Sequence, residues 1–203
     1  MSLPGPTLFL DFILLCLMIE ATPGPNMGSL ALVAMRSGLR AGMMMVVGIS
    51  VGLSVVALVS ALGGAVALTH YPWLGQGLRV AGACYLFWLA WEAWQTADIP
   101  YSVHTQPESR YMRQGLVLNL LNPKAMIFYA VVMPRFAQDQ LPLWPQLAIL
   151  SAVSVAIATL MHSGIALLAS RGHGTRPRWM SQRRIHRLFA VLLGLVALWF
   201  LLG

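Results

Sequence analysis

Residues 115–136 read GLVLNLLNPKAMIFYAVVMPRF, an apolar stretch that Asn122-Pro123-Lys124 interrupts near its middle. Without the interruption this stretch is long enough for a membrane-spanning helix, which needs about 20 mostly apolar residues. Proline removes a backbone N–H donor and ends or kinks a helix. Because lipid cannot satisfy the backbone groups that are set free, such a break must face protein or a water-filled cavity. The tripeptide therefore predicts a broken helix at membrane depth.

A second break of the same kind lies in the apolar run 8–35, where residues 22–26 read TPGPN. Two interrupted hydrophobic segments at corresponding places in two halves of a chain indicate the binding site of a transporter. Asn122 followed by Pro123 is a helix-start signal, since asparagine caps free amides and proline is tolerated at the first helical position. We expect both restarting helices to favour an anionic group, such as a substrate carboxylate, at their N-termini.

The composition is that of an integral membrane protein, with 58% hydrophobic and only 9% charged residues. Soluble domains have about 25% charged residues. One all-α transmembrane domain over 1–203 is therefore predicted. Its six expected spans are 8–35, 42–68, 73–94, 115–136, 144–170 and 185–202, with the first and fourth broken.

The cysteine positions and the absence of known motifs argue against several other classes of protein. Cys16 and Cys84 both lie inside apolar runs, which predicts packing and no disulfide framework. The chain has no metal-binding spacing, phosphate-binding loop or nucleophile motif, so we predict no metal, no cofactor and no enzyme activity. The N-terminus lacks a positive segment, and the first run is therefore interpreted as a retained span.

Basic residues set the expected orientation. They gather after the first span (Arg36, Arg40), after the third (Arg110, Arg113) and after the fifth, where six arginines lie within 171–187. The positive-inside rule puts these loops in the cytoplasm and both termini outside. The segment 171–187 suits anionic lipid or RNA. We favour contact with lipid headgroups and predict no nucleic-acid partner.

The six spans divide into two halves of three, at about 1–98 and 112–203. Because three is odd, the second half crosses the membrane in the opposite orientation to the first. This is the inverted-repeat plan of many secondary transporters. In the second span, Gly48 and Gly52 are separated by three residues. Such pairs allow two helices to approach closely, and close packing is the interpretation that we favour here.

Lys124 is the residue with the clearest functional signal. A cation at the bilayer centre costs at least about 2.5–3.5 kcal/mol, and a helix N-terminus disfavours it further. We expect a compensating anion, either a protein carboxylate or a bound substrate. The alternative is a lysine that extends to the membrane interface, but Lys124 lies about ten residues from both ends of its span.

Three ionisable residues are candidates for proton coupling. Glu20, just before the first break, would pair with Lys124, carry a proton or hold a substrate amino group. Asp11 lies nine residues earlier, near the expected outer mouth. His162 lies within the fifth span and would act in a proton relay, because histidine titrates near neutrality, or only in a helix–helix hydrogen bond. Asn119, on the same helix face as Asn122, would bind substrate or satisfy the broken backbone.

Four segments together resemble the LysE/RhtB family of amino-acid exporters: ATPGPN at 21–26, RSGLRAG at 36–42, GACYL at 82–86 and LNPKA at 121–125. The resemblance covers essentially the whole chain. It implies a six-helix bacterial inner-membrane protein that exports amino acids or related metabolites with the proton gradient. The substrate-binding positions that it implies are Pro23, Gly24, Pro25, Asn26, Asn122, Pro123 and Lys124.

Competing functions are a passive channel, a metal-ion exporter and a membrane scaffold. A metal path would need clustered carboxylate, histidine or thiolate groups, and a scaffold has no need for a midplane lysine and two broken helices. The expected partners are a small-molecule substrate, protons and membrane lipids. The identity of the substrate and the oligomeric state, including a homo-oligomer, are open from sequence.

Overall fold

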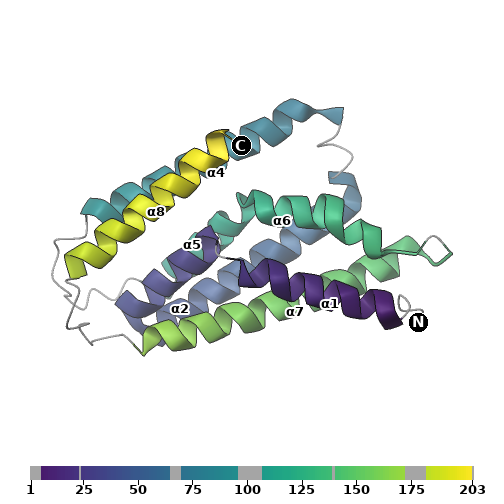
Figure 1. The fold of residues 1–203 in the computed structure, drawn as a ribbon, viewed down its shortest axis with the longest axis horizontal. Helices are drawn as coiled ribbons and strands as arrows, with labels where there is room; N and C mark the ends of the chain where they lie inside the picture. Colours follow the sequence, from purple (N-terminus) through teal and green to yellow (C-terminus); the bar gives the residue numbers. More distant parts are fainter. Residues whose placement is uncertain are drawn as a thin grey trace.

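The computed structural model describes residues 6–22, 24–64, 70–95, 107–138, 140–171 and 182–202. Every regular element in these ranges is helical (Figure 1). The elements are α1 (Pro6–Ala21), α2 (Pro25–Val59), η1 (Ser60–Gly64), α4 (Pro72–Gln95), α5 (Glu108–Leu120), α6 (Pro123–Ile127), η3 (Phe128–Val132), η4 (Met133–Phe136), α7 (Leu143–Ser170) and α8 (Gln182–Leu202).

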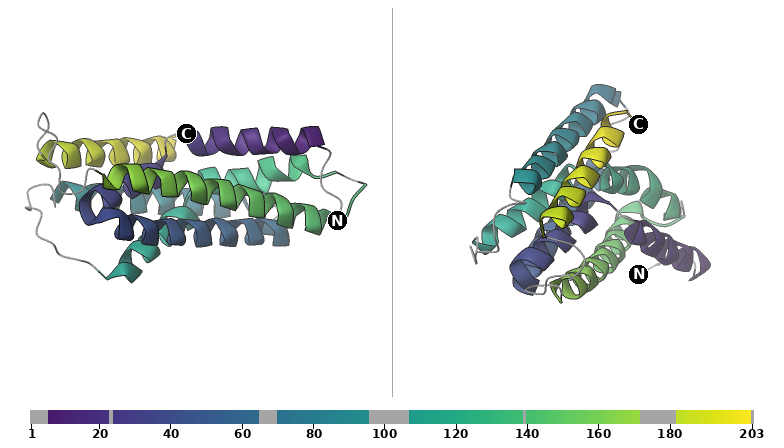
Figure 2. Two further views of the ribbon diagram at one scale, coloured as in Figure 1. Left: turned by 90° about the horizontal axis from the view of Figure 1, so that it is seen from below. Right: turned by 60° about the vertical axis from the view of Figure 1, so that its left-hand side comes forward.

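The helices form a main bundle with an additional helix pair beside it. In the bundle, α2 packs against both α5 and α7, and α1 lies against α7. The additional pair is α4 and α8, which pack mainly against each other (Figures 1 and 2). The site described below lies within the bundle, where α1, α2, α5, α6 and α7 meet.

Both predicted breaks are present. The first interrupts the chain between the end of α1 at Ala21 and the start of α2 at Pro25. The second separates the end of α5 at Leu120 from the start of α6 at Pro123. Each new helix begins with proline at its first turn, where the missing N–H has no helical partner to lose.

The chain reverses within α2 at Gly38, whose φ of 84° and ψ of 177° are not helical. A Cβ on Gly42 would lie 2.9 Å from the Cβ of Ala34. Eight residues of straight helix would separate these positions by about 12 Å, so residues 25–38 and 39–59 are two arms that run side by side (Figure 1). A positive φ is favoured only by glycine, which explains the turn at this residue. The turn lies between the first two predicted spans, 8–35 and 42–68, and the spans themselves stay a prediction.

Close packing at the predicted glycine pair is also confirmed. A Cβ on Gly48 would lie 1.9 Å from the carbonyl oxygen of Met112, and one on Gly115 would lie 2.3 Å from that of Met45. The backbones of α2 and α5 therefore touch without side chains between them. A Cβ on Gly52 would lie 2.9 Å from the Cβ of Asn119, so the same contact positions a residue of the candidate site.

By length and composition, two helical segments in the described residues are long and apolar enough to cross a membrane, Pro25–Gly63 and Leu143–Ser170. The turn at Gly38 divides the first of them into its two arms. The pair Glu108–Leu120 and Lys124–Phe136, bent by 54°, makes a third if it is one span. By itself α1 has only 16 residues, fewer than the number that a bilayer requires. The six-span arrangement therefore stays a prediction.

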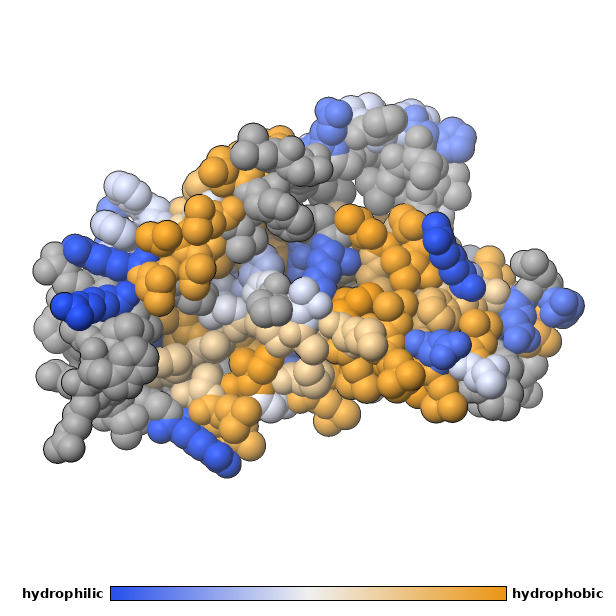
Figure 3. Space-filling model, in the orientation of Figure 1, coloured by the Kyte–Doolittle hydropathy of each residue, from blue (hydrophilic) through white to orange (hydrophobic). Residues whose placement is uncertain are grey.

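The outer surface of the described helices is strongly apolar. Exposed leucine, methionine and tryptophan side chains include Leu10, Met18, Leu160, Leu168 and Trp91. Figure 3 shows hydrophobic residues across much of one face. Apolar area on this scale suits a lipid environment.

Charged residues near the described borders of the predicted cytoplasmic loops contact one another or a tryptophan at one end of the molecule. Arg40, just after the Gly38 turn, forms an ion pair with Glu108 at 2.6 Å (Nε to Oε1). Arg110 forms another with Glu92, at 2.7 Å (Nη2 to Oε1). At this end Arg187 also lies 4.9 Å from the centre of the Trp94 ring. These contacts bring residues near the described borders of the three predicted loops together, and the orientation of this end in the membrane stays a prediction.

Candidate functional site

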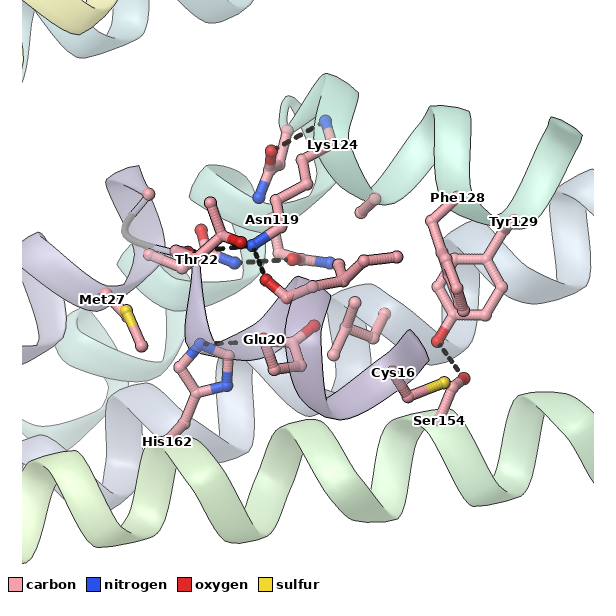
Figure 4. A pocket seen from close by; sticks show the side chains of 16 residues that line it. Cys16, Glu20, Thr22, Met27, Asn119, Lys124, Phe128, Tyr129, Ser154 and His162 are labelled. Atoms are coloured by element: carbon pink, nitrogen blue, oxygen red, sulfur yellow. Dashed lines mark hydrogen bonds and ion pairs between the residues drawn. The ribbon is translucent and has the colours of Figure 1, made fainter. Parts of the chain in front are cut away.

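The two helix breaks meet at one pocket (Figure 4). Among the residues that line it are seven predicted from the sequence: Glu20, Gly24, Asn26, Asn119, Asn122, Lys124 and His162. They come from both halves of the chain, and up to 142 positions separate them along the sequence. The tertiary structure therefore collects most of the candidate residues in one place.

Lys124 is held by the open end of α1. Its Nζ donates hydrogen bonds to the carbonyl oxygens of Ile19 and Thr22, the second at 3.1 Å. Carbonyl groups at a helix C-terminus lack helical partners and carry the negative end of the helix dipole. The end of a broken helix thus supplies a negative partial charge that the sequence did not indicate, and the expected carboxylate or substrate partner stays a prediction.

Asn122 caps α6 as predicted. Its backbone is extended (φ −87°, ψ 107°), and its side-chain oxygen accepts a hydrogen bond from the Lys124 amide at 3.0 Å. Because Pro123 has no N–H and the next amide is capped, the start of α6 has fewer free donors than we expected. Binding of an anion at this helix start stays a prediction.

The start of α2 is different. Gly24 is extended (φ −152°, ψ 177°) and no side chain caps the helix. The amides of Asn26 and Met27 therefore lie in the first turn without a side-chain cap, and both residues line the pocket. A helix with an uncapped N-terminus favours a negatively charged group at this point.

Asn26 and Asn119 link the two halves directly. Asn26 Nδ2 donates to Asn119 Oδ1 at 2.8 Å, and both side chains are buried. The prediction for Asn119 left substrate binding and backbone satisfaction open. In the structure its side chain accepts a hydrogen bond from the side chain of Asn26, in the first turn of α2, and no bond to a backbone group of the described residues is formed.

Glu20 lies beside His162, with Oε2 3.8 Å from Nε2. The other ring nitrogen, Nδ1, lies 2.7 Å from the carbonyl oxygen of Ala158. A carbonyl oxygen only accepts hydrogen bonds, so Nδ1 carries a proton and Nε2 faces the carboxyl group. Attraction between Nε2 and the carboxyl group then requires a proton on one of them. The proposed role of this pair in proton coupling stays a prediction.

Four predicted residues are not placed in this pocket. Asp11 is exposed on α1 and is not among the lining residues, so its role in proton coupling stays a prediction. Pro25 lines a small neighbouring cavity with Tyr85 and Leu118. Pro123 begins α6, and Pro23 lies outside the residues that the structure describes.

Several lining residues were missed from the sequence. Tyr129 and Ser154 form a buried hydrogen bond, with 2.8 Å between Oη and Oγ. Cys16, interpreted only as a packing residue, lines the same region with Phe128. The sequence did offer one signal for this pair. Tyr129 lies within an apolar run, and a buried tyrosine hydroxyl needs a hydrogen-bond partner.

Comparison with known proteins places the chain among transporters. The model for LysE type translocators matches residues 17–203. The chain is 26% identical over 163 residues to the homoserine/homoserine lactone efflux protein of Salmonella typhimurium, with 79% of each protein covered. It is 27% identical over 185 residues to the threonine efflux protein of Escherichia coli K12, covering 85% of this chain and 89% of that protein.

An uncharacterized membrane protein of Pseudomonas aeruginosa is 31% identical over 179 residues, with 81% of this chain and 83% of that protein covered. No solved structure shows a significant match. The family match covers most of the 203 residues and includes both helix breaks. The protein therefore belongs to the family of LysE type translocators.

Proposed function

We propose that the protein is a secondary transporter that exports amino acids or related small metabolites across the bacterial inner membrane, driven by the proton gradient. One observation carries this proposal. The Lys124 ammonium and the Glu20 carboxyl group line the same pocket between two broken helices. A cation and an acid at this depth are costly unless they are used, and together they match the two charges of an amino acid. The names of two relatives, which refer to efflux of threonine and of homoserine, support this class of substrate.

The substrate carboxylate would bind between Lys124 and the start of α2. Lys124 Nζ already lies 3.1 Å from the carbonyl oxygen of Thr22, at the first break. The amides of Asn26 and Met27 begin the next helix without a side-chain cap. A carboxylate here would receive charge-assisted hydrogen bonds from both sides, and Lys124 would exchange its contacts with α1 for contacts with the substrate.

The substrate ammonium would bind at Glu20, whose carboxyl group is partly exposed to the pocket. The same carboxyl group would take up a proton, with His162 as its neighbour. A proton and an ammonium group cannot both occupy one carboxylate favourably. Loading the substrate therefore favours release of the proton, and protonation favours release of the substrate. This mutual exclusion is what an antiporter requires to couple export to proton entry.

The inverted-repeat plan would supply the alternating access. Halves of about 1–98 and 112–203, with three spans each, would place the two breaks at the same depth and both termini outside. The contacts that support this arrangement cross between halves, from Lys124 to the end of α1 and from Asn26 to Asn119. Rocking of one half against the other would open the pocket to each side in turn.

The decisive test is an efflux screen in proteoliposomes. Vesicles loaded with single radiolabelled amino acids would be compared with and without a pH gradient, and empty liposomes would serve as the control. We expect at least one amino acid to leave faster with protein present, and still faster when the external side is acidic. Equal rates in protein-containing and empty liposomes for every amino acid would refute an amino-acid exporter.

A further inference from the structure

The hydrogen bond between Asn26 and Asn119 leaves half of each amide without a partner. Asn26 Oδ1 and Asn119 Nδ2 are both buried, and neither has a hydrogen-bond partner. The exposed fraction is 8% for Asn26 and 0% for Asn119. Both residues line the pocket, and Figure 4 shows the Asn119 amide in the same part of it as the Lys124 ammonium.

This result does not depend on how the amide groups are turned. If both were rotated, Asn119 would donate to Asn26, and one NH₂ group and one carbonyl oxygen would again be left over. Buried polar atoms without partners are destabilising, and most proteins avoid them. A donor and an acceptor that are both free beside a pocket therefore indicate a ligand that supplies the missing hydrogen bonds.

The chemistry of the two free atoms restricts that ligand. A hydroxyl group both donates and accepts hydrogen bonds, and so does a carboxamide. A carboxylate only accepts and an ammonium only donates, and these two groups have their own partners in Lys124 and Glu20. What remains of an amino acid is its side chain.

We infer that Asn26 and Asn119 form the side-chain subsite of this transporter and select amino acids with a neutral hydrogen-bonding side chain, a hydroxyl or a carboxamide. This inference rests on the proposed function. It adds a preference for one class of amino acid over apolar ones of equal shape. The subsite joins residues from both halves of the chain, so occupying it also stabilises the contact between them.

The packing around Asn119 keeps its amide in place. A Cβ on Gly52 would lie 2.9 Å from Asn119 Cβ and 3.2 Å from Nδ2, so the glycine leaves space that any other residue would fill. With its position restricted on this side, the amide cannot easily turn away to find another partner. A fixed polar group discriminates against a ligand that lacks the matching hydrogen bond.

Transport rates of matched amino acids in proteoliposomes test the inference. Uptake by counterflow would be measured for three pairs of amino acids that match in shape: threonine and valine, homoserine and norvaline, asparagine and leucine. We expect the polar member of at least one pair to be transported at least about 10-fold faster. If amino acids are transported but no pair favours its polar member, this inference fails while the proposed function stands. If no amino acid is transported, the proposed function itself fails.

Two variants connect the preference to these residues. The double variant Asn26→Leu/Asn119→Leu replaces the amides with apolar groups of similar size, and we expect the polar-to-apolar rate ratio to fall to about 1. The single variant Asn26→Ala removes one amide with less disturbance of packing, and it should lower the ratio in the same direction. An unchanged ratio in whichever of the two variants is folded would overturn the assignment.

A matched control removes a polar pair elsewhere. Ser50 and Thr159 are hydrogen bonded at 2.7 Å between α2 and α7 and do not line the pocket. Ser50→Ala/Thr159→Val should therefore keep the wild-type ratio. A fall in this control as large as in the asparagine variants would show that the ratio reports helix packing in general, and would also overturn the assignment.

Discussion

Lys124 and Asn26 occupy the same place in the two helix breaks, since each directly follows the proline that begins a new helix. Each also bonds to the opposite half of the chain. Lys124 donates to the carbonyl oxygens of Ile19 and Thr22 at the end of α1, and Asn26 donates to Asn119 near the end of α5. Such reciprocal contacts are expected if two inverted halves face each other around one site.

Replacing Lys124 with methionine should abolish transport. The variant Lys124→Met keeps the length of the side chain but removes the charge that would hold a substrate carboxylate. Hydrogen bonds between the ammonium and a substrate carboxylate would contribute about 3 kcal/mol. Losing them corresponds to a transport rate roughly 100-fold lower. Efflux would be measured together with the amount of protein in the membrane, which should equal or exceed that of wild type. Arg135→Met, at an exposed position of η4, is the control for loss of a cation, and wild-type efflux in Lys124→Met would contradict the assignment.

Glu20→Gln should separate exchange from proton coupling. Glutamine keeps the shape and hydrogen bonding of the side chain but cannot take up a proton at this position. We expect counterflow of substrate to remain measurable, although weaker because the ammonium loses its charged partner. The increase in efflux caused by a pH gradient should disappear. Vesicles of the variant that respond to the gradient like wild type would remove Glu20 from the coupling step and leave His162 or Asp11 as candidates.

The end that carries Arg40, Arg110 and Arg171 should face the cytoplasm, because basic residues are retained on that side. In a background without Cys16 and Cys84, single cysteines at exposed positions would report sidedness to a membrane-impermeant thiol reagent. We expect Gln140→Cys to be labelled on intact cells, and Arg171→Cys to be labelled only after the membrane is permeabilised. The reverse pattern would invert the proposed topology.

Gly48→Ala should destabilise the fold, because the added Cβ would lie 1.9 Å from the Met112 carbonyl oxygen. Two backbones would have to separate, and the free energy of unfolding should fall by about 3 kcal/mol or more. The melting temperature of purified protein in detergent would measure the effect. Gly77→Ala is the matched control, since nothing lies within 4 Å of a Cβ at that position. An equal melting temperature for Gly48→Ala and wild type would show that α2 and α5 do not approach as described.

The features that the sequence by itself determined are local. Proline lacks an N–H wherever it stands, so the breaks before Pro25 and Pro123 follow from those residues alone. The cap at Asn122 involves an amide only two positions away. Gly48 and Gly52 mark a close approach because they have no side chain, although the sequence does not say which helix fills the space. These predictions held because each depends on a residue and its nearest neighbours.

The partners of the charged and polar groups were decided only by the tertiary structure. Lys124 and Ile19 are 105 positions apart, and the acceptor is a backbone carbonyl that every residue has, so no residue type identifies it. Glu20 faces His162 because α1 packs against α7. Asn26 meets Asn119 because α2 folds back at Gly38 and lies against α5. A helix break shows that backbone groups need partners, but only the packing of helices from both halves determines which groups meet them.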